Sequence, residues 1–204
     1  QTFFDTLQQK EADYEKREGQ EKMTDFIWDQ LHHENHALIE AGTGSGKTLA
    51  YLIPSILWSL QNQSPVVIST KTKQLQHQLV EKEMPKLKEH LPYPFTYAVI
   101  KGKSNYIDLR QFDALYAQYQ HRQENEFVLE FLGLLNWVLQ TKTGDLAECH
   151  PRIYNQFATF IRHDKDRINN SAPDKNCFHL HAKKKTKTAN LIICNHALVL
   201  SDTI

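Results

Sequence analysis

One short stretch decides the fold of this chain: Ala41-Gly42-Thr43-Gly44-Ser45-Gly46-Lys47-Thr48. It fits the pattern [Ala/Gly]-x-x-x-x-Gly-Lys-Thr. The glycines allow the backbone to curl, so that successive N–H groups point into one anion-sized hollow. A helix predicted to begin at the end of this stretch adds its positive N-terminal dipole. The stretch therefore predicts a loop that binds phosphate groups.

The last two residues of the loop carry the predicted chemistry. The ammonium of Lys47 reaches the β- and γ-phosphates of a nucleotide as a mobile point charge. The hydroxyl of Thr48 is placed to bind a Mg²⁺ ion that bridges the same phosphates. We therefore predict Lys47 and Thr48 as catalytic residues and ATP with Mg²⁺ as cofactors, Thr48 being the predicted metal ligand. The alternative is a chance glycine-rich turn.

Strands and helices are predicted to alternate around this loop. Short apolar runs predict strands over residues 37–39, 65–69 and 95–100. Helical periodicity predicts helices over residues 20–34, 48–60 and 72–90. A kink is expected at Pro54 in the second helix. Leu75, Leu79 and Leu87 are expected on one face of the third. This alternation is typical of an α/β fold with a doubly wound parallel sheet.

The alternation stops in the middle of the chain. Between Tyr106 and Ala189 the sequence shows helical periodicity but no buried strand, and an apolar strand returns at 191–194. Ordinary connections are short, so these residues predict an inserted helical module. The expected divisions are residues 1–106, 107–189 and 190–204. Residues 169–176 read as a loop, and the expected core residues of the module are Phe127, Leu132, Leu135, Trp137, Phe157 and Phe160.

Composition narrows the class of protein. Lys plus Arg (24) equals Asp plus Glu (24), which excludes a globally basic nucleic-acid binder but allows a local basic groove. No apolar run is long enough for a bilayer, and the start of the chain lacks a signal peptide. The first residue is not Met, which indicates part of a longer chain. The three cysteines, at no disulfide-like spacing, favour a reducing, cytoplasmic setting.

Several further motifs resemble those of one family, the DinG/XPD type of superfamily 2 helicases. The similarity covers nearly the whole chain. It rests on Arg17-x-x-Gln20-x-x-Met23, Glu40 to Pro54, Lys101-Gly-Lys-Ser-Asn-Tyr106, Thr143-Gly-Asp-Leu146 and Asn195-His-Ala-Leu198. The chain is therefore identified as similar to the first RecA-like, P-loop domain of a DinG-like helicase, with its insertion.

The resemblance implies roles for residues outside the loop. Arg17 and Gln20 would contact adenine, for which a Gln amide suits as donor and acceptor. Single-stranded DNA would run along a surface groove, with donors and positive charge contacting its backbone. The implied contacts are Thr70, Lys71, Thr72, Lys73, Gln74, Lys101, Lys103 and Asn105. For each set, the alternative is an exposed helix end with no ligand.

The sequence departs from the family at one cofactor. Relatives commonly hold a [4Fe–4S] cluster on four cysteines of the insertion. Here Asp108 stands at the first position, Cys177 fits the last, and residues 169–176 contain no cysteine. One thiolate does not hold a cubane, so we expect no iron–sulfur cluster. A zinc site at Cys177, His179 and His181 is the weaker alternative, because closed zinc sites use better-defined pairs.

The motifs leave three functions open. The first is the ATP-binding portion of a DinG-like, DNA-dependent ATPase and helicase. Its acidic, water-orienting pair is expected beyond Ile204, so this portion alone should be inactive. The second is an ATP-sensing regulatory domain of a protein whose main activity is a 3′–5′ exonuclease. The third is a binding module with a vestigial ATP site. Expected partners are single-stranded DNA, or a duplex with a single-stranded tail, and the remaining helicase domains of the chain.

Overall fold

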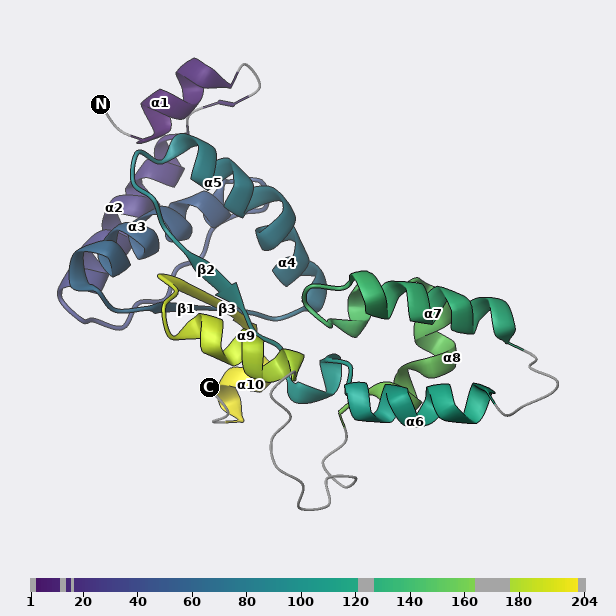
Figure 1. Cartoon of the computed structure of the whole chain (residues 1–204). Coiled ribbons are helices and arrows are strands. Elements are labelled where there is room, and N and C mark those ends of the chain that lie inside the picture. The colour runs from purple at the N-terminus through teal and green to yellow at the C-terminus, as the bar shows by residue number, and fades with distance from the viewer. Residues whose placement is uncertain (1–2, 12–13, 16, 121–126, 164–176, 202–204) are drawn as a thin grey trace. The chain divides into compact units, whose positions relative to one another are not determined.

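The computed structural model describes residues 3–11, 14–15, 17–120, 127–163 and 177–201 (Figure 1). The chain divides into two compact units, which are described separately. The first unit consists of residues 1–99 and 188–203, and the second of residues 100–187. The loop predicted at 169–176 lies outside the described residues.

A three-stranded parallel sheet forms the centre of the first unit. Its strands are β1 (Val66–Thr70), β2 (Tyr97–Val99) and β3 (Leu191–Asn195), in the order β1-β3-β2. Leu191 is paired with Val66 on one side and with Tyr97 on the other. The apolar residues of β3 are buried, as expected for a central strand covered on both faces. A strand more than 90 residues away in sequence therefore separates β1 from β2.

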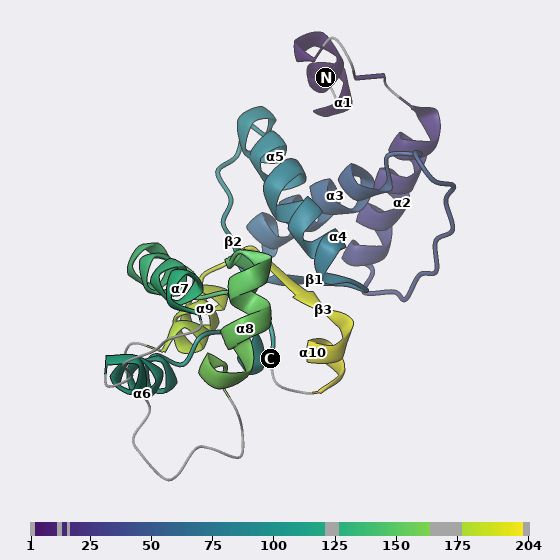
Figure 2. The ribbon, with the colours of Figure 1, turned by 90° about the vertical axis from the view of Figure 1, so that its right-hand side faces the viewer.

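Helices cover both faces of this sheet. In Figures 1 and 2, α2 to α5 lie on one side of the sheet and α10 lies on the other, which agrees with a doubly wound RecA-like fold. Pro54 lies inside α3 without ending it. The helical segments of this unit are α1 (Phe3–Lys10), α2 (Glu18–His32), α3 (Lys47–Asn62), α4 (Lys73–Gln78), the π-helical η1 (Leu79–Glu83), α5 (Met84–His90) and α10 (His196–Leu200).

The segment predicted as one helix over 72–90 contains a π-helical turn. Leu79 and Leu87 are buried as expected, but Leu75 is 48% exposed. The prediction of one shared face was therefore wrong for Leu75. Leu75 precedes the π-helical turn, in the short helix Lys73–Gln78, so the turn does not account for its exposure. Leu75 instead lines a cavity beside α3.

The strand expected at residues 37–39 is absent from this part of the structure. Leu38 is fully exposed and Ile39 is 36% exposed. A strand requires hydrogen bonds from a neighbouring strand. The three strands of the described sheet pair with one another and not with this segment. The predicted strand at 37–39 was therefore wrong, because apolar composition does not provide a pairing partner.

The second unit is mainly helical, as expected. Its helices α6 and α7 both pack against α8 (Figure 2). Rings of Tyr119 and Phe131 stack with centroids 4.1 Å apart, and Phe157 meets both rings edge-on. The elements are η2 (Lys103–Asn105), α6 (Leu109–Gln120), α7 (Val128–Gln140), η3 (Leu146–Glu148), α8 (Pro151–Ile161) and α9 (Phe178–Thr186).

Two residues expected in the core of this unit are on its surface. Leu132 is 52% exposed and Phe160 is 53% exposed, whereas Phe157 is 2% exposed. Phe127, Leu135 and Trp137 are partly buried against the cluster. Phe160 follows Phe157 by three residues, but α8 presents only one narrow stripe to α6 and α7.

Within the described residues, no helix is long and apolar enough to cross a membrane.

Candidate functional site

The predicted phosphate-binding loop curls through two left-handed glycines. Gly44 and Gly46 have φ angles of 73° and 78°, a region in which residues with a Cβ are strained. The Ser45 hydroxyl donates to the carbonyl of Gly42 at 2.8 Å, which closes the curl. Helix α3 begins directly after Gly46. The local sequence thus places a glycine-rich turn against the positive end of a 16-residue helix.

Lys47 folds back over this loop. Its ammonium donates to the carbonyl of Ala41 at 2.5 Å and to that of Gly42 at 3.0 Å. These carbonyls hold the charge at the mouth of the loop. Phosphate oxygens are stronger acceptors for an ammonium than neutral carbonyls are. Lys47 is therefore placed to exchange these contacts for contacts with a bound anion.

Gln20 is in direct contact with the loop. Its side-chain amide donates to the Gly46 carbonyl at 2.9 Å, and its amide oxygen accepts from the Tyr14 hydroxyl. Gln20 is buried, whereas Arg17 is exposed. Both residues line one open cavity of about 390 Å³, together with Thr48. The structure thus brings the two predicted adenine-contacting residues and the loop to one cavity.

Charged side chains from η1 and α5 complete this cavity. Lys82, Glu83 and Lys86 line it opposite the loop. Burial raises the pKa of Glu83, and the charges of Lys86 and Lys82 oppose that rise. Two lysine side chains therefore line a cavity that Gly46 and Thr48 also border, which favours an anionic ligand.

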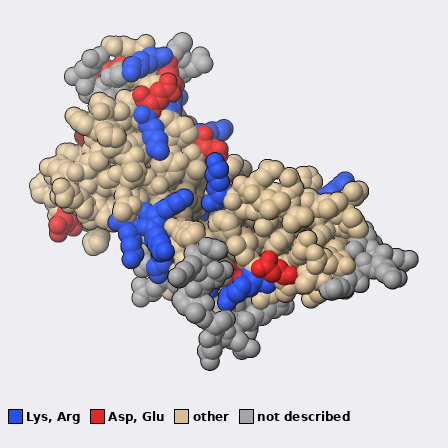
Figure 3. All heavy atoms as spheres, viewed as in Figure 1, with Lys and Arg blue, Asp and Glu red and all other residues tan. Residues whose placement is uncertain are grey.

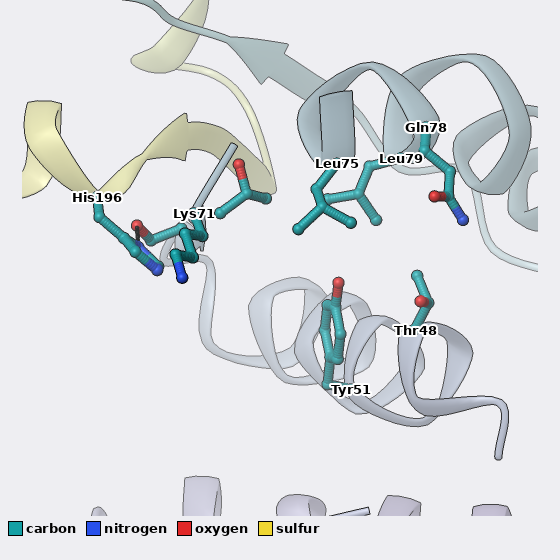
Figure 4. Close-up of a pocket in the computed structure, with 9 residues that line it drawn as sticks. Thr48, Tyr51, Lys71, Leu75, Gln78, Leu79 and His196 are labelled. Carbon is teal, nitrogen blue, oxygen red and sulfur yellow. Dashed lines mark hydrogen bonds between the residues drawn. The ribbon is translucent and has the colours of Figure 1, made fainter. Parts of the chain in front are cut away.

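A second cavity lies on the other side of Thr48 (Figure 4). In this view Thr48 and Tyr51 point from α3 toward Leu75 and Leu79. Burial, and then the charge of Glu83, raises the pKa of Tyr51, so its hydroxyl stays protonated at neutral pH. The volume of this cavity is about 170 Å³. Thr48 borders both cavities. It therefore lies between the cavity beside the loop and the cavity at the edge of the sheet.

The ends of β1 and β3 form the far wall of the second cavity. The Ser69 hydroxyl lies 2.6 Å from Nδ1 of His196, at the start of α10, and Figure 4 shows His196 beside Lys71. Asn195 caps α10 by accepting from the Leu198 amide at 3.0 Å. Parallel strands end at the same edge of a sheet, where open α/β sheets bind ligands. The Asn195-His196 motif is thus a cap and a contact at that edge.

Only part of the segment predicted to contact DNA in the first unit is exposed to solvent. Thr70, one of the implied DNA contacts, is 7% exposed, and its hydroxyl donates to the carbonyls of Thr72 and Cys194, so it is buried and already has partners. A side chain at the carboxyl end of a packed strand fills the space between strand and helix. Thr72 caps α4 through a bond from the Leu75 amide. Lys71, Lys73 and Gln74 are exposed.

The remaining predicted DNA contacts belong to the second unit. The Lys101 ammonium forms an ion pair with Asp145, and both side chains are largely buried. The Asn105 side chain donates to the Gly102 carbonyl at 3.0 Å. Lys103 is half-buried in η2. Burial raises the pKa of Tyr106 to about 12, so its hydroxyl, which accepts from the Lys101 amide, stays neutral. Lys101 therefore has a structural partner already.

The donor set in the second unit does not fit a cubane cluster. Asp108 and Cys177 both contact His163, which lies between them. Cys149 is buried beside η3, and Cys194 lies in β3, in the first unit. An imidazole thus fills the place between the first and last positions of the family's cluster. Within the described ranges, no group of three or more His, Cys, Asp or Glu side chains is arranged to hold a metal.

Charge is distributed without a dominant sign. On the face shown in Figure 3, Lys and Arg side chains gather in small groups among neutral surface, and Asp and Glu lie interspersed. This agrees with the equal numbers of basic and acidic residues in the sequence. Electrostatic attraction for a polyanion is therefore local rather than general.

Sequence reasoning missed several residues of the site. Tyr14 holds Gln20, His196 holds Ser69, and Tyr51 borders Thr48. The chain brings His196 to Ser69 across 127 positions. No short-range spacing encodes such a contact. The sequence marked His196 only as part of the family-like Asn195-His196 motif, and the motif did not indicate what His196 contacts.

Replacing Gly46 with Ala tests the contact between the loop and Gln20. The new Cβ would lie 2.3 Å from Nε2 of Gln20, at a φ of 78°. We expect a loss of about 1–3 kcal/mol in the free energy of unfolding, measured by urea denaturation. The matched control is Gly44→Ala, which has similar φ but open space around its Cβ. Equal losses in the two variants would refute the contact, and adding Gln20→Ala should restore part of the Gly46→Ala loss.

Comparison with known proteins points to one family. A sequence model of the family described as "DEAD/DEAH box helicase" matches residues 21–125. The matched region begins in α2, contains the loop and β2, and ends after α6. It therefore includes the loop, Lys47 and Thr48.

Curated relatives match over most of the chain. It is 36% identical over 193 residues to a protein named 3'-5' exonuclease DinG from Bacillus subtilis (strain 168), covering 93% of this chain and 20% of that protein. It is 30% identical over 203 residues to ATP-dependent DNA helicase YoaA from Haemophilus influenzae, covering 96% of this chain and 30% of that protein. The chain thus spans less than a third of the length of these relatives.

Proposed function

The chain belongs to the DEAD/DEAH box helicase family, and from that membership we propose that it binds Mg-ATP as the ATP-binding portion of a DinG-like, DNA-dependent ATPase. One observation carries the proposal. The glycine-rich loop, the Lys47 ammonium and the Gln20 amide all meet at the start of α3. The backbone amides and the ammonium supply positive ends for phosphates.

Each part of the nucleotide has its residues in this proposal. Residues 41–48 cradle the phosphates, and Lys47 pairs with the β- and γ-phosphates. Thr48 provides the hydroxyl for Mg²⁺, which neutralises charge on the phosphates when bound. Arg17 and Gln20 lie on the cavity wall where adenine would bind. The Tyr14 hydroxyl and the Gly46 carbonyl together fix the orientation of the Gln20 amide, so that contact with adenine would use the remaining N–H or replace one of these bonds.

Single-stranded DNA is the proposed polymer. Lys71, Lys73 and Gln74 are exposed at the carboxyl edge of the sheet, beside the cavity that Thr48 borders. Lys103 and Asn105 are proposed as further contacts on the second unit. Lys101 would take part only by exchanging Asp145 for phosphate. Such contacts read the backbone and not the base sequence.

The activity of the longer protein is proposed from its relatives. One relative's name is that of an ATP-dependent DNA helicase and the other's is that of a 3'-5' exonuclease. We propose a cytoplasmic protein in which this portion works with further helicase domains of the same chain. The second candidate is an ATP-sensing role that regulates an exonuclease without unwinding. Its support is the greater identity to the exonuclease-named relative, 36% against 30%.

Mg-ATP should raise the melting temperature of the protein by several degrees. A ligand at about 100 times its dissociation constant adds about 2.7 kcal/mol to stability. At roughly 2–4 °C per kcal/mol for this chain length, the shift should be about 5–10 °C. Differential scanning fluorimetry measures it, with ATP plus EDTA as the control that removes the metal. An unchanged melting temperature at millimolar Mg-ATP would instead favour the vestigial site.

A further inference from the structure

Three buried polar side chains meet in the second unit, outside the nucleotide site. Asp108 is 4% exposed, His163 is 6% exposed and Cys177 is 8% exposed. Nδ1 of His163 lies 3.1 Å from a carboxylate oxygen of Asp108. Nε2 of the same ring lies 3.3 Å from Sγ of Cys177. One imidazole therefore bridges a carboxylate and a thiol.

The three side chains come from three separate segments. Asp108 precedes α6 and caps it, because its carboxylate accepts from the Arg110 amide at 3.0 Å. His163 follows the end of α8, and Cys177 directly precedes α9. The Asp108 amide also donates to the Ile161 carbonyl at 2.7 Å, which fixes the approach of α8 to α6. The position of the imidazole is therefore set by the packing of the helices.

The carboxylate of Asp108 lies against the imidazole and is itself held in its ionised form. Burial raises the pKa of Asp108, but hydrogen bonds from Arg110 and the charge of His163 outweigh this and hold the pKa below its usual value. A carboxylate 3.1 Å from Nδ1 favours the tautomer with its proton on that nitrogen, and Nε2, which faces the Cys177 sulfur, is then the atom that accepts the thiol proton. Carboxylate, imidazole and thiol in this order are the arrangement that activates a sulfur nucleophile.

Other charged groups surround the imidazole. Arg110 on α6 pairs with Asp108 at 3.4 Å. On α9, burial lowers the pKa of His179, as do the positive charges of Lys103, His163 and Lys183. His179 is therefore neutral near pH 7 and does not compete for the carboxylate.

The other two cysteines provide internal comparisons. Burial, and then the charges of Glu148 and Asp145, raises the pKa of Cys149 to about 12. Burial also raises the pKa of Cys194, which is fully buried in β3. Cys149 is 7% exposed, almost the same as Cys177 at 8%. Cys149 and Cys177 thus have nearly the same exposure, but Cys149 lies near two carboxylates, whereas Cys177 contacts an imidazole.

We propose that Cys177 is a modification site for small, uncharged electrophiles such as alkyl halides and peroxides, activated by His163, which Asp108 positions. With a haloacetamide, the thiol proton moves to Nε2, sulfur bonds to carbon, and halide leaves with the electron pair. With a peroxide, sulfur bonds to one oxygen and the O–O bond breaks. Hydroxide leaves and takes the proton from His163, so sulfur is oxidised to sulfenic acid and the peroxide is reduced.

Alkylation at pH 6.5 tests the proposal on the native protein. The protein is treated with limiting iodoacetamide, quenched at several times, digested, and quantified at each cysteine by mass spectrometry. An ordinary thiol with a pKa of about 8.5 is only about 1% thiolate at this pH. We expect Cys177 to react at least about tenfold faster than Cys149. Equal rates at Cys177 and Cys149 would overturn the proposal.

Two further measurements distinguish activation of Cys177 by His163 from a purely structural role of His163. His163→Gln should slow the reaction of Cys177 by at least about tenfold, while His181→Gln, an exposed position on the same helix as His179, should leave it unchanged. If His163→Gln unfolds, as circular dichroism would show, the pH profile of the unaltered protein decides. Its Cys177 rate should change little between pH 6 and 8. If the alkylation rate of Cys177 instead falls about tenfold for each unit by which the pH is lowered, as for an ordinary thiol, His163 does not activate the sulfur.

Discussion

Replacing Lys47 with Ala is expected to remove most of the thermal stabilisation by Mg-ATP. The Lys47 ammonium is held at the mouth of the loop by the carbonyls of Ala41 and Gly42. Charge-assisted hydrogen bonds of such an ammonium are worth about 1.5–3 kcal/mol each, so affinity should fall roughly 100-fold. At a ligand concentration giving about 2.7 kcal/mol in the unaltered protein, only about 0.4 kcal/mol would remain.

The measurement compares each variant with and without Mg-ATP by differential scanning fluorimetry. This removes any effect of Lys47 on the ligand-free loop. The matched control is Lys73→Ala, an exposed lysine of the same unit at the start of α4. Lys73→Ala should keep the full Mg-ATP shift and weaken binding of a fluorescent single-stranded oligonucleotide. A full shift in Lys47→Ala would show that ATP does not bind at this loop.

The same substitution separates the two activities proposed for the longer protein. If the ATP-binding portion drives strand separation, Lys47→Ala should abolish duplex unwinding by the longer protein. If it serves only as a sensor, there should be no unwinding to lose, and exonuclease activity should lose its response to ATP. Unwinding that survives in the variant would contradict the proposed motor.

Replacing Phe157 with Ala should destabilise the second unit by about 3–5 kcal/mol. Phe157 is 2% exposed and meets Tyr119 and Phe131 edge-on with centroids 6.0 Å away. Removing the ring leaves a cavity at the junction of α6, α7 and α8, and removes two aromatic contacts. A loss of this size is a large share of the stability of an ordinary domain.

Phe160→Ala is the matched control, on the same helix and with the same atoms removed. Phe160 is 53% exposed, so its loss should cost less than about 1 kcal/mol. Urea denaturation followed by circular dichroism measures both variants. Similar losses in the two variants would show that α8 packs through a different face from the one described.

Periodicity and motifs predicted most elements of this chain. Residues 47–62 formed the expected helix, and β1 and β3 lie where apolar runs placed them. Errors occurred where a local pattern lacked information about neighbours. Phe160 and Leu132 are apolar at helical spacing and yet exposed, because the period does not say how wide a stripe the neighbouring helices cover. Residues 37–39 are apolar and yet unpaired.

The sequence by itself determined the loop at residues 41–48, because the glycines and Lys47 act through their own backbone and the helix they begin. It also determined the helix after the loop and the three strands β1, β2 and β3. Only the tertiary structure decided that Tyr14 would hold Gln20, that His196 would reach Ser69, and that Asp108, His163 and Cys177 would meet. The reason is physical: local conformation depends on neighbours along the chain, whereas these contacts depend on how buried apolar surfaces pack segments that are far apart in sequence.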